Sequence, residues 1–205
     1  VAALAGNRPT LVVSSDVRTG RPSSGDEANL GDAGAALLIG SDTDGPVLAE
    51  WLGGASATAE FLDRWRQPGW NYSRVWEERF GESVYLPLVT EAANAAFKQT
   101  ALDPADVDAV IISGLHARAS RGAARAAGVE GARVVDDLTS VIGNTGSPHA
   151  ALVLASVLDE ASPGQLIMIV SLADGCDVGF FRTTGAIDGY TPATSVADQI
   201  EGGND

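Results

Sequence analysis

The feature that most constrains the fold is an alternation of helical and extended apolar segments that starts after Pro87 and continues to Thr183. Apolar residues recur at helical spacing in some segments and form short, β-branched runs in others. The pattern predicts helices over residues 89–97, 117–127 and 149–160, and strands over residues 107–112, 133–135, 165–171 and 177–183. This alternation is typical of a mostly parallel sheet with helices on both faces, and the last two strands follow closely enough to be antiparallel. We therefore expect an α/β fold with a mixed sheet.

Two further strands are predicted near the start of the chain. Residues 11–15 form a short β-branched run that indicates a buried strand, and residues 33–39 form a second apolar run after a Gly- and Ser-rich loop. We expect these two strands to pair in one sheet. Residues 1–6 resemble the end of an apolar helix, so we expect further sequence upstream. Residues 149–160 are apolar on nearly every face, which predicts a helix buried in the middle of the protein.

Changes of composition divide the chain into four parts, at residues 1–45, 46–85, 86–185 and 186–205. All four tryptophans lie between residues 41 and 85, where no regular period is visible. We interpret 46–85 as a Trp-rich insertion that forms an acyl pocket, a partner surface or a small satellite core under a loop. Residues 186–205 contain Pro and Gly with few periodic apolar positions, which is typical of a linker or tail.

The charge and cysteine content exclude several classes of protein. The net charge is −14 with thirteen Lys and Arg residues, which argues against a general nucleic-acid surface, because phosphate binding requires clustered cations. No apolar run approaches the roughly 20 residues that span a bilayer, and no signal-peptide pattern is present, so we expect a cytoplasmic protein that does not bind membranes. One cysteine and two histidines provide neither a disulfide framework nor a usual zinc ligand set, so no metal site is expected.

Four short segments place glycine or polar residues at the ends of predicted apolar strands. They are residues 31–36, 113–116, 142–147 and 171–176. Ligands of open α/β sheets bind at the carboxyl ends of the strands. These segments are therefore the candidates for a functional site.

Together, and in this order, the four segments resemble the thiolase superfamily, in the branch of hydroxymethylglutaryl-CoA synthases and initiating ketoacyl carrier-protein synthases. In that branch a Gly-Ala-rich strand closes the N-terminal half, matched by residues 31–36. A later strand delivers a catalytic His, matched by His116, with a basic residue five positions on, matched by Arg121. A Gly-Asn-Thr turn follows, matched by residues 143–145, and the final hairpin has a glycine-rich turn, matched by Gly175.

The resemblance implies a thiolase-like fold, in which this chain holds the C-terminal half and the last strands of the N-terminal half. It implies an acyltransferase that condenses acyl-CoA or acyl carrier protein thioesters, with the nucleophilic cysteine upstream of Val1, so that the chain alone is inactive. His116, Asn144 and Gly175 would then be catalytic, and Arg121 would bind the phosphates of coenzyme A. The coenzyme A thioester would be a substrate, and no cofactor would be permanently bound.

These residue types suit a Claisen condensation. The reaction needs an acyl group on a thiolate, a base or electrostatic partner for the enolate, and donors for the developing oxyanion. An imidazole can donate an N–H or take up a proton, and an amide is a permanent donor. The expected partners are acyl-CoA, the N-terminal half, a second copy in a homodimer and an OB-fold/zinc-ribbon domain.

Two other functions fit the same resemblance. One is a non-catalytic thiolase-like subunit that binds acyl-CoA or serves as a scaffold. The other is a retro-aldol or thiolytic lyase on the same fold. The sequence also departs from the synthase pattern, because Pro is absent after His116-Ala117 and because Pro148-His149 replaces small residues.

Structural roles compete with functional ones at several residues. The side chain of Asn144 can stabilise a Gly-Asn turn by a hydrogen bond within the turn. His149 is interpreted as a packing or capping residue. The resemblance places the nucleophile elsewhere, so Cys176 is interpreted as a buried small hydrophobe. The carboxylates near strand ends, at Asp32, Asp174 and Asp177, have no metal-ligand spacing and are expected to be exposed in turns.

Overall fold

A mixed sheet of five strands forms the centre of the structure, a computed structural model in which residues 8–203 are described. Its strands lie in the order β3-β9-β8-β6-β7. They are β3 (Ala49–Ala57), β9 (Cys176–Thr183), β8 (Leu166–Leu172), β6 (Ala109–Gly114) and β7 (Arg133–Val134). β6 is parallel to both β7 and β8, whereas β9 is antiparallel to β8 and β3. The predicted mixed α/β sheet is confirmed.

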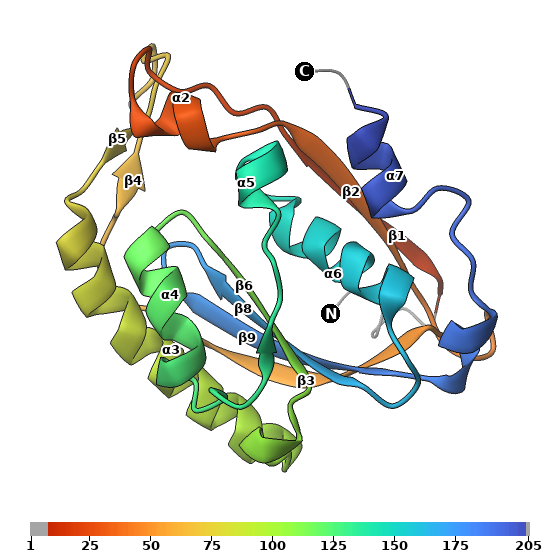
Figure 1. Ribbon diagram of the computed structural model, residues 1–205. Helices are drawn as coiled ribbons and strands as arrows, with labels where there is room; N and C mark the ends of the chain where they lie inside the picture. The colour runs from red at the N-terminus through yellow and green to blue at the C-terminus, as the bar shows by residue number, and fades with distance from the viewer. Residues whose placement is uncertain (1–7, 204–205) are drawn as a thin grey trace.

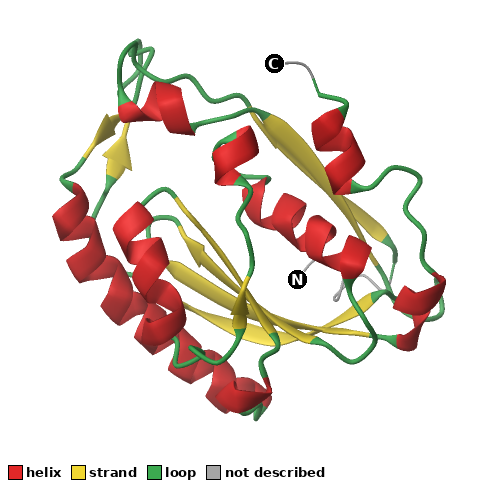
Figure 2. Cartoon of the chain, viewed as in Figure 1, coloured by secondary structure: helices red, strands yellow, loops and turns green. Residues whose placement is uncertain are grey.

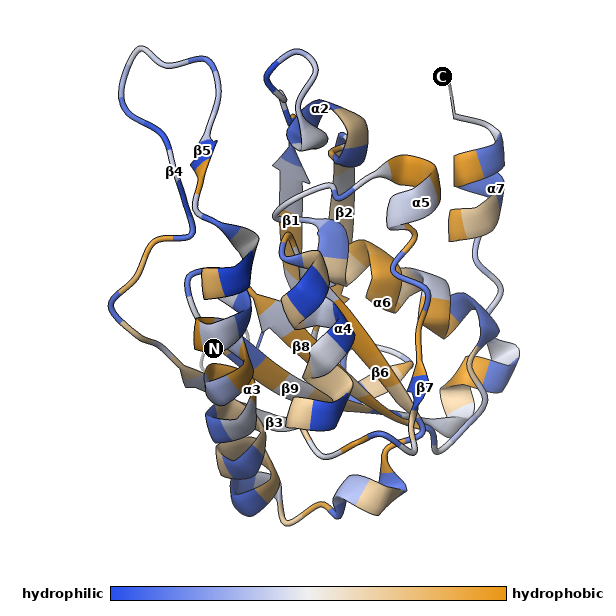
Figure 3. Ribbon diagram, turned by 60° about the vertical axis from the view of Figure 1, so that its left-hand side comes forward, coloured by the Kyte–Doolittle hydropathy of each residue, from blue (hydrophilic) through white to orange (hydrophobic). Residues whose placement is uncertain are grey.

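The central strands are apolar along nearly their whole length because helices cover both faces. Five consecutive residues of β6, from Ala109 to Ser113, are buried, and β8 is buried at most positions. A continuous apolar run of this kind is expected for parallel strands that face no solvent. Figure 3 shows the hydrophobic colour along β6 and β8.

Helices α3 (Glu78–Thr100) and α4 (Ala117–Ala126) cover one face of this sheet, and α6 (His149–Glu160) covers the other (Figure 1). Small side chains allow these helices to pack closely on the sheet and on each other. Ala92 and Ala96 of α3 are fully buried, and Gly122 of α4 lies against Leu86. α6 is packed between the central sheet and a second sheet, which confirms the predicted buried helix (Figure 2).

Within the described residues, the second sheet consists of β1 (Thr10–Asp16) and β2 (Ala33–Ile39), which pair antiparallel as predicted. Its inner face lies on α6. Its outer face exposes Leu11, Val13 and Leu38, which are 62%, 64% and 73% accessible. The prediction of a buried strand at residues 11–15 is therefore wrong for the outer face, because no described element covers it.

The structure differs from the sequence interpretation of residues 46–85. β3 is an edge strand of the central sheet, and α3 begins at Glu78 and continues through Pro87. The strand was not recognised because its centre is Gly53-Gly54, without the β-branched pattern, and because a bulge interrupts its register after Trp51. The segment that leaves the sheet is therefore residues 58–77. It contains a short hairpin, β4 (Arg64–Trp65) and β5 (Arg74–Val75).

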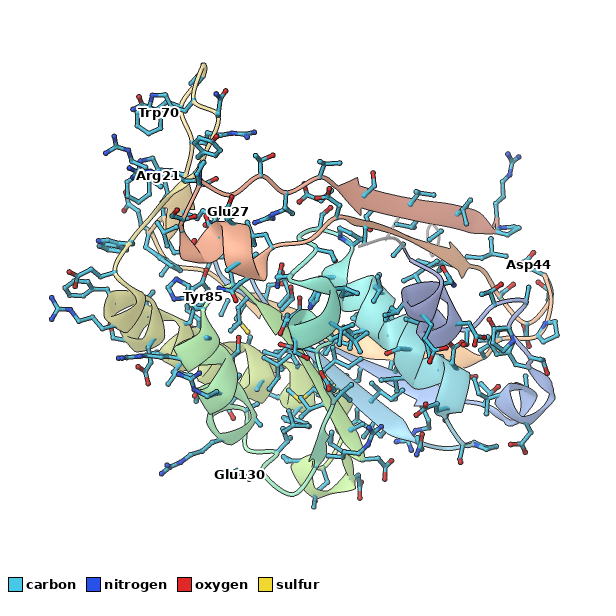
Figure 4. All side chains as sticks on the ribbon, turned by 45° about the horizontal axis from the view of Figure 1, so that its top comes forward. Arg21, Glu27, Asp44, Trp70, Tyr85 and Glu130 are labelled. Atoms are coloured by element: carbon cyan, nitrogen blue, oxygen red, sulfur yellow. The ribbon has the colours of Figure 1, made fainter. Side chains whose placement is uncertain are left out.

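The tryptophans of this region do not form a satellite core. Trp51, Trp65 and Trp76 are 48%, 37% and 42% accessible, and Trp70 lies near the outer tip of the hairpin, stacked under Arg74 (Figure 4). An open hollow of about 670 Å³ at this tip is lined by Trp70, Tyr72 and their neighbours.

The predicted tail contains ordered structure. After a 3-10 turn at Gly185–Gly189, helix α7 (Val196–Glu201) starts with a capping box between Ser195 and Asp198. The backbone N–H of Val196 donates to the carboxylate of Asp159 on α6 at 2.7 Å, which holds the tail against that helix. The interpretation of 186–205 as a linker is corrected accordingly. The helix end predicted at residues 1–6 lies outside the described residues.

The remaining described elements are short. They are α2 (Gly25–Asn29), α5 (Thr139–Ile142) and a 3-10 turn at Pro104–Asp106. Among residues 8–203, no helix combines the length and apolarity needed to cross a membrane.

Candidate active site

Two of the four candidate segments meet at the carboxyl end of the parallel strands. Gly114 at the end of β6 is in register with Leu172 at the end of β8. His116 follows β6 and is the N-cap residue of α4, while the β8–β9 turn starts at Ala173. The expectation that segments 113–116 and 171–176 lie at the carboxyl ends of strands is confirmed, and the strand register brings the two segments together.

The ring of His116 is enclosed by residues from two other parts of the chain, the segment before α3 and α3 itself. Its side chain is 4% accessible, and its Nε2 lies 3.1 Å from Oδ2 of Asp63. Neither Nε2 nor Nδ1 makes a hydrogen bond of good geometry among residues 8–203. The Tyr85 ring lies 5.3 Å away between centroids. Gly81 of α3 lies so close that a β-carbon there would overlap the imidazole.

Asp63 connects the site to the segment 58–77. Its Oδ2 contacts His116 and also accepts the hydroxyl of Tyr85 at 3.0 Å. Burial by itself would raise the pKa of Asp63, but the contacts with His116, Tyr85 and nearby Arg64 outweigh it and hold the pKa below its ordinary value. Asp63 is therefore a carboxylate at neutral pH. Figure 4 shows Tyr85 in the body of the molecule, far from the hairpin tip at Trp70.

The β8–β9 turn adds a second carboxyl group to this cluster. The backbone N–H of Asp174 donates to the Tyr85 hydroxyl at 3.3 Å. Burial and the neighbouring Asp63 carboxylate both raise the pKa of Asp174. The same two influences, burial first, raise the pKa of Tyr85 above its ordinary value, so its hydroxyl stays protonated.

Asn144 links the other two candidate segments. Its backbone N–H donates to Asn29 at 2.8 Å, and its carbonyl accepts from Gly31 at 3.1 Å. Gly143 has a φ of +68°, and a β-carbon there would overlap the backbone at Leu30. The Gly-Asn sequence is therefore needed where the 142–147 turn crosses the start of segment 31–36.

The side chain of Asn144 makes two hydrogen bonds. Its Oδ1 accepts the backbone N–H of Gly146 at 2.9 Å, and its Nδ2 donates to the carbonyl of Gly114 at 3.3 Å. The first contact is the turn-stabilising role that the sequence left open. The second brings the amide to the end of β6, two residues before His116. An amide nitrogen carries two hydrogens, so this arrangement leaves one for a ligand.

Comparison with known proteins gives a consistent result. No family model matches the chain. It is 31% identical over 175 residues to a hydroxymethylglutaryl-CoA synthase of Thermoplasma volcanium, covering 85% of this chain and 49% of that protein. A second such synthase, of Methanothermobacter thermautotrophicus, is 33% identical over 166 residues, covering 80% of this chain and 47% of that protein. The chain spans about half the length of the curated relatives it matches.

Solved structures show the same fold. A hydroxymethylglutaryl-CoA synthase complexed with CoA has a TM-score of 0.77 at 14% identity, covering 98% of this chain and 55% of that one. A 3-oxoacyl-[acyl-carrier-protein] synthase III of Aquifex aeolicus has a TM-score of 0.71 at 16% identity, covering 88% and 60%. The chain is similar in sequence to these synthases over the matched region and shares the thiolase-like fold of the solved structures. The thiolase-like fold predicted from the four segments is confirmed.

In this thiolase-like chain, Gly175 lies in the β8–β9 turn and Arg121 lies on α4. Gly175 is buried in the β8–β9 turn, and a β-carbon there would come within 2.8 Å of the carbonyl of Ala57. This close approach of the turn to β3 requires glycine. Arg121 lies on α4, five residues after His116, and is exposed to solvent.

Cys176 is a buried member of the core and is 1% accessible. Burial, with a smaller contribution from Asp177, raises the pKa of its thiol to about 12. The interpretation as a small buried hydrophobe is confirmed. Asp32, Asp174 and Asp177 are exposed, as expected. Within the described part of the chain, no group of three or more His, Cys, Asp or Glu side chains could hold a metal ion.

Sequence reasoning missed Asp63 and Tyr85. Both lie in the region without a visible period, and their role depends on contacts over 53 and 31 positions of sequence with His116. The available signal was a single carboxylate directly after two apolar residues, at Phe61-Leu62-Asp63, and this signal is too common to identify a site alone.

Proposed function

We propose that the whole protein is an acyltransferase that forms carbon–carbon bonds between acyl-CoA or acyl carrier protein thioesters, and that this chain supplies His116 and Asn144. The observation that carries the proposal is the position of His116. The residue is buried at the carboxyl end of β6 against the Asp63 carboxylate, beside the turn that brings the Asn144 amide to Gly114. The similarity to hydroxymethylglutaryl-CoA synthases supports this function.

The contacts suggest how the two residues would act. A carboxylate only accepts hydrogen bonds, so the proton of a neutral His116 belongs on Nε2, toward Asp63. Nδ1 is then free to accept a proton and, once protonated, to donate to a thioester oxygen. The second hydrogen of Asn144 Nδ2 is a permanent donor. Two such donors would stabilise the enolate of one thioester or the oxyanion formed when it attacks the other.

The nucleophilic thiolate must come from outside these 205 residues. The chain contains one cysteine, and burial with a pKa near 12 keeps the Cys176 thiol protonated and inaccessible. The curated relatives are about twice as long as the matched region, which leaves room for a second half with its own cysteine. We therefore propose that this chain alone is inactive.

The binding of coenzyme A would depend on the positive charge of Arg121 on α4. Arg121 is exposed on α4 after His116, so its guanidinium can reach the phosphates of coenzyme A despite the acidic chain. The solved synthase complexed with CoA supports a coenzyme A thioester as a substrate. We propose that no other cofactor is permanently bound.

The proposed assembly rests on the small sheet. In the described part of the chain β1 pairs with β2 alone, and the outer face exposes Leu11, Val13 and Leu38. Exposed strand edges and apolar faces favour association. We propose that the N-terminal half covers this surface, that the whole protein is a cytoplasmic homodimer, and that an OB-fold/zinc-ribbon domain is a further partner. Sedimentation of the whole protein tests the dimer, which a monomer at micromolar concentration would contradict.

A product assay tests the proposed activity. The whole protein is incubated with acetyl-CoA alone and with acetoacetyl-CoA, and the products and released CoA are quantified by mass spectrometry. Time-dependent formation of a condensed thioester, with matching CoA release, is expected for the whole protein and not for residues 1–205 alone. Cleavage of added condensed thioester without any condensation would favour the lyase, and thioester binding without turnover would favour the non-catalytic subunit.

A further inference from the structure

His149 is a buried histidine that the proposed chemistry does not use. It is the first residue of α6 and is 1% accessible. The N-cap residue of that helix, Pro148, makes no side-chain hydrogen bond. Instead the ring of His149 reaches back to the preceding turn, where its Nδ1 accepts the backbone N–H of Thr145 at 3.3 Å and lies 3.2 Å from the Thr145 hydroxyl.

This contact acts on the residue next to Asn144. Thr145 is fully buried, so its N–H has no access to water. The turn around it contains Gly143 and Gly146 with φ of +68° and +74°, positions with little intrinsic rigidity. Besides the backbone bonds of Asn144 and a contact of the Ser147 hydroxyl with the Ser15 carbonyl, two side chains bind N–H groups of the turn: Asn144 Oδ1 binds that of Gly146, and His149 Nδ1 binds that of Thr145. The orientation of the Asn144 amide therefore depends on both contacts.

The tautomer of His149 decides whether this acceptor is available, and its Nε2 is buried without a hydrogen-bond partner among residues 8–203. Nδ1 can accept from Thr145 only when the proton of the neutral ring is on Nε2. Burial lowers the pKa of His149, against the opposing influence of the charge and backbone of Asp137. The other charged groups beside the turn are Asp16 and Arg18, which pair with each other at 3.2 Å and lie against Gly146. The ring is therefore neutral at neutral pH.

We propose that His149 is a positioning residue, whose Nδ1 fixes the Thr145 N–H and thereby aims the Asn144 amide at the end of β6. The catalytic part of this inference rests on the proposed function of Asn144. The structural part is that Asn144 keeps its contact with Gly114 only when an acceptor occupies the Nδ1 position. This part can be tested without any measurement of activity.

Two substitutions separate positioning from packing. His149→Asn keeps an acceptor oxygen near the Nδ1 position but loses volume. His149→Leu keeps much of the volume but removes the acceptor. If the ring only fills space, the Leu variant is the better tolerated of the two. If the ring positions the turn, the Asn variant is the better tolerated of the two.

The test measures condensation by the whole protein, with folding checked by circular dichroism. We expect His149→Leu to lower kcat about tenfold to a hundredfold, less than the roughly 10²- to 10³-fold cost of removing an oxyanion donor, because the amide is displaced and not removed, with KM within about twofold. His149→Asn should retain kcat within about threefold of wild type. The opposite order of the two variants, or equal loss in both, would overturn the proposal. If the Leu variant does not fold, His149→Gln replaces it, because its terminal oxygen occupies the Nε2 position, and a similar loss is expected.

Crystal structures of the same variants test the positioning role of His149 separately from the proposed catalytic function. The distance from Asn144 Nδ2 to the Gly114 carbonyl, 3.3 Å here, should persist in His149→Asn and be lost in His149→Leu. If wild type shows no condensation, the proposed function fails while these structures still test the positioning role. An unmoved Asn144 in the Leu variant would contradict it whatever the activity.

Discussion

The Asp63 carboxylate contacts the buried imidazole of His116, with Oδ2 3.1 Å from Nε2. The same oxygen accepts the Tyr85 hydroxyl, so the carboxylate is held from two sides. Asp63 comes from the segment 58–77, which leaves the central sheet after β3 and returns to it through α3. The segment therefore brings a charge to the site in addition to forming an exposed hairpin.

Removing that charge should weaken the site without unfolding it. Asp63→Asn keeps the shape of the side chain, but its neutral amide no longer stabilises an imidazolium at His116. We expect kcat of the whole protein to fall about tenfold to a hundredfold, with a smaller change in KM. Steady-state kinetics measures this, and Asp42→Asn, at an exposed position, is the matched control. Equal activities of the two variants would show that Asp63 has no role at His116.

Gly81 should tolerate no side chain. A β-carbon at this position of α3 would overlap the His116 ring, whereas one at Gly131 meets no atom within 4 Å. We expect Gly81→Ala to displace His116, lower activity and reduce the free energy of unfolding by about 1–3 kcal/mol. Gly131→Ala should change stability by less than about 0.5 kcal/mol. Urea denaturation compares them, and an unaffected Gly81→Ala would contradict the enclosed ring.

Cys176 should be unreactive in the folded protein. Its thiol is buried, and the pKa near 12 leaves almost no thiolate at neutral pH. Labelling with iodoacetamide, followed by peptide mass spectrometry, should modify Cys176 only after urea is added. Rapid labelling without urea, or an acyl group on Cys176 after incubation with acyl-CoA, would contradict the placement of the nucleophile outside this chain.

The stability of the protein should fall on the acid side because of His149. Its pKa is lowered on folding, so below its ordinary value of 6.5 the unfolded chain binds the proton more readily than the folded one. The contribution of His149 to the free energy of unfolding is complete above pH 6.5 and decreases as the pH falls toward the lowered pKa. The pKa of Asp63 is also lowered, so its contribution to stability likewise decreases as the pH falls below its ordinary value of 3.8. The pKa of Asp174 is raised, so its contribution to stability increases as the pH falls. Urea midpoints between pH 7 and 5 should fall more steeply for wild type than for His149→Asn, and parallel curves would contradict this assignment.

The fold was predictable where local pattern and tertiary environment agree. β2 and α6 were found with their observed bounds, since a short apolar run after a Gly- and Ser-rich loop indicates a strand and an all-apolar helix indicates packing on several sides. β3 was missed because the glycines at its centre are required by close contacts, Gly54 with β9 and Gly53 with Thr100 of α3, and these contacts add no periodic signal. Asp63 and Tyr85 were missed for a related reason, since only tertiary packing brings them to His116.

The central claim is that His116 carries out chemistry on a thioester in the whole protein. The most direct measurement is the condensation rate of His116→Ala relative to wild type, with acetyl-CoA and acetoacetyl-CoA at saturation and with equal circular dichroism spectra. Loss of a positioned acid–base or donor group predicts a decrease of about 10²- to 10⁴-fold in kcat, with acyl-CoA still bound. A His116→Ala protein that condenses thioesters at the wild-type rate would contradict the account.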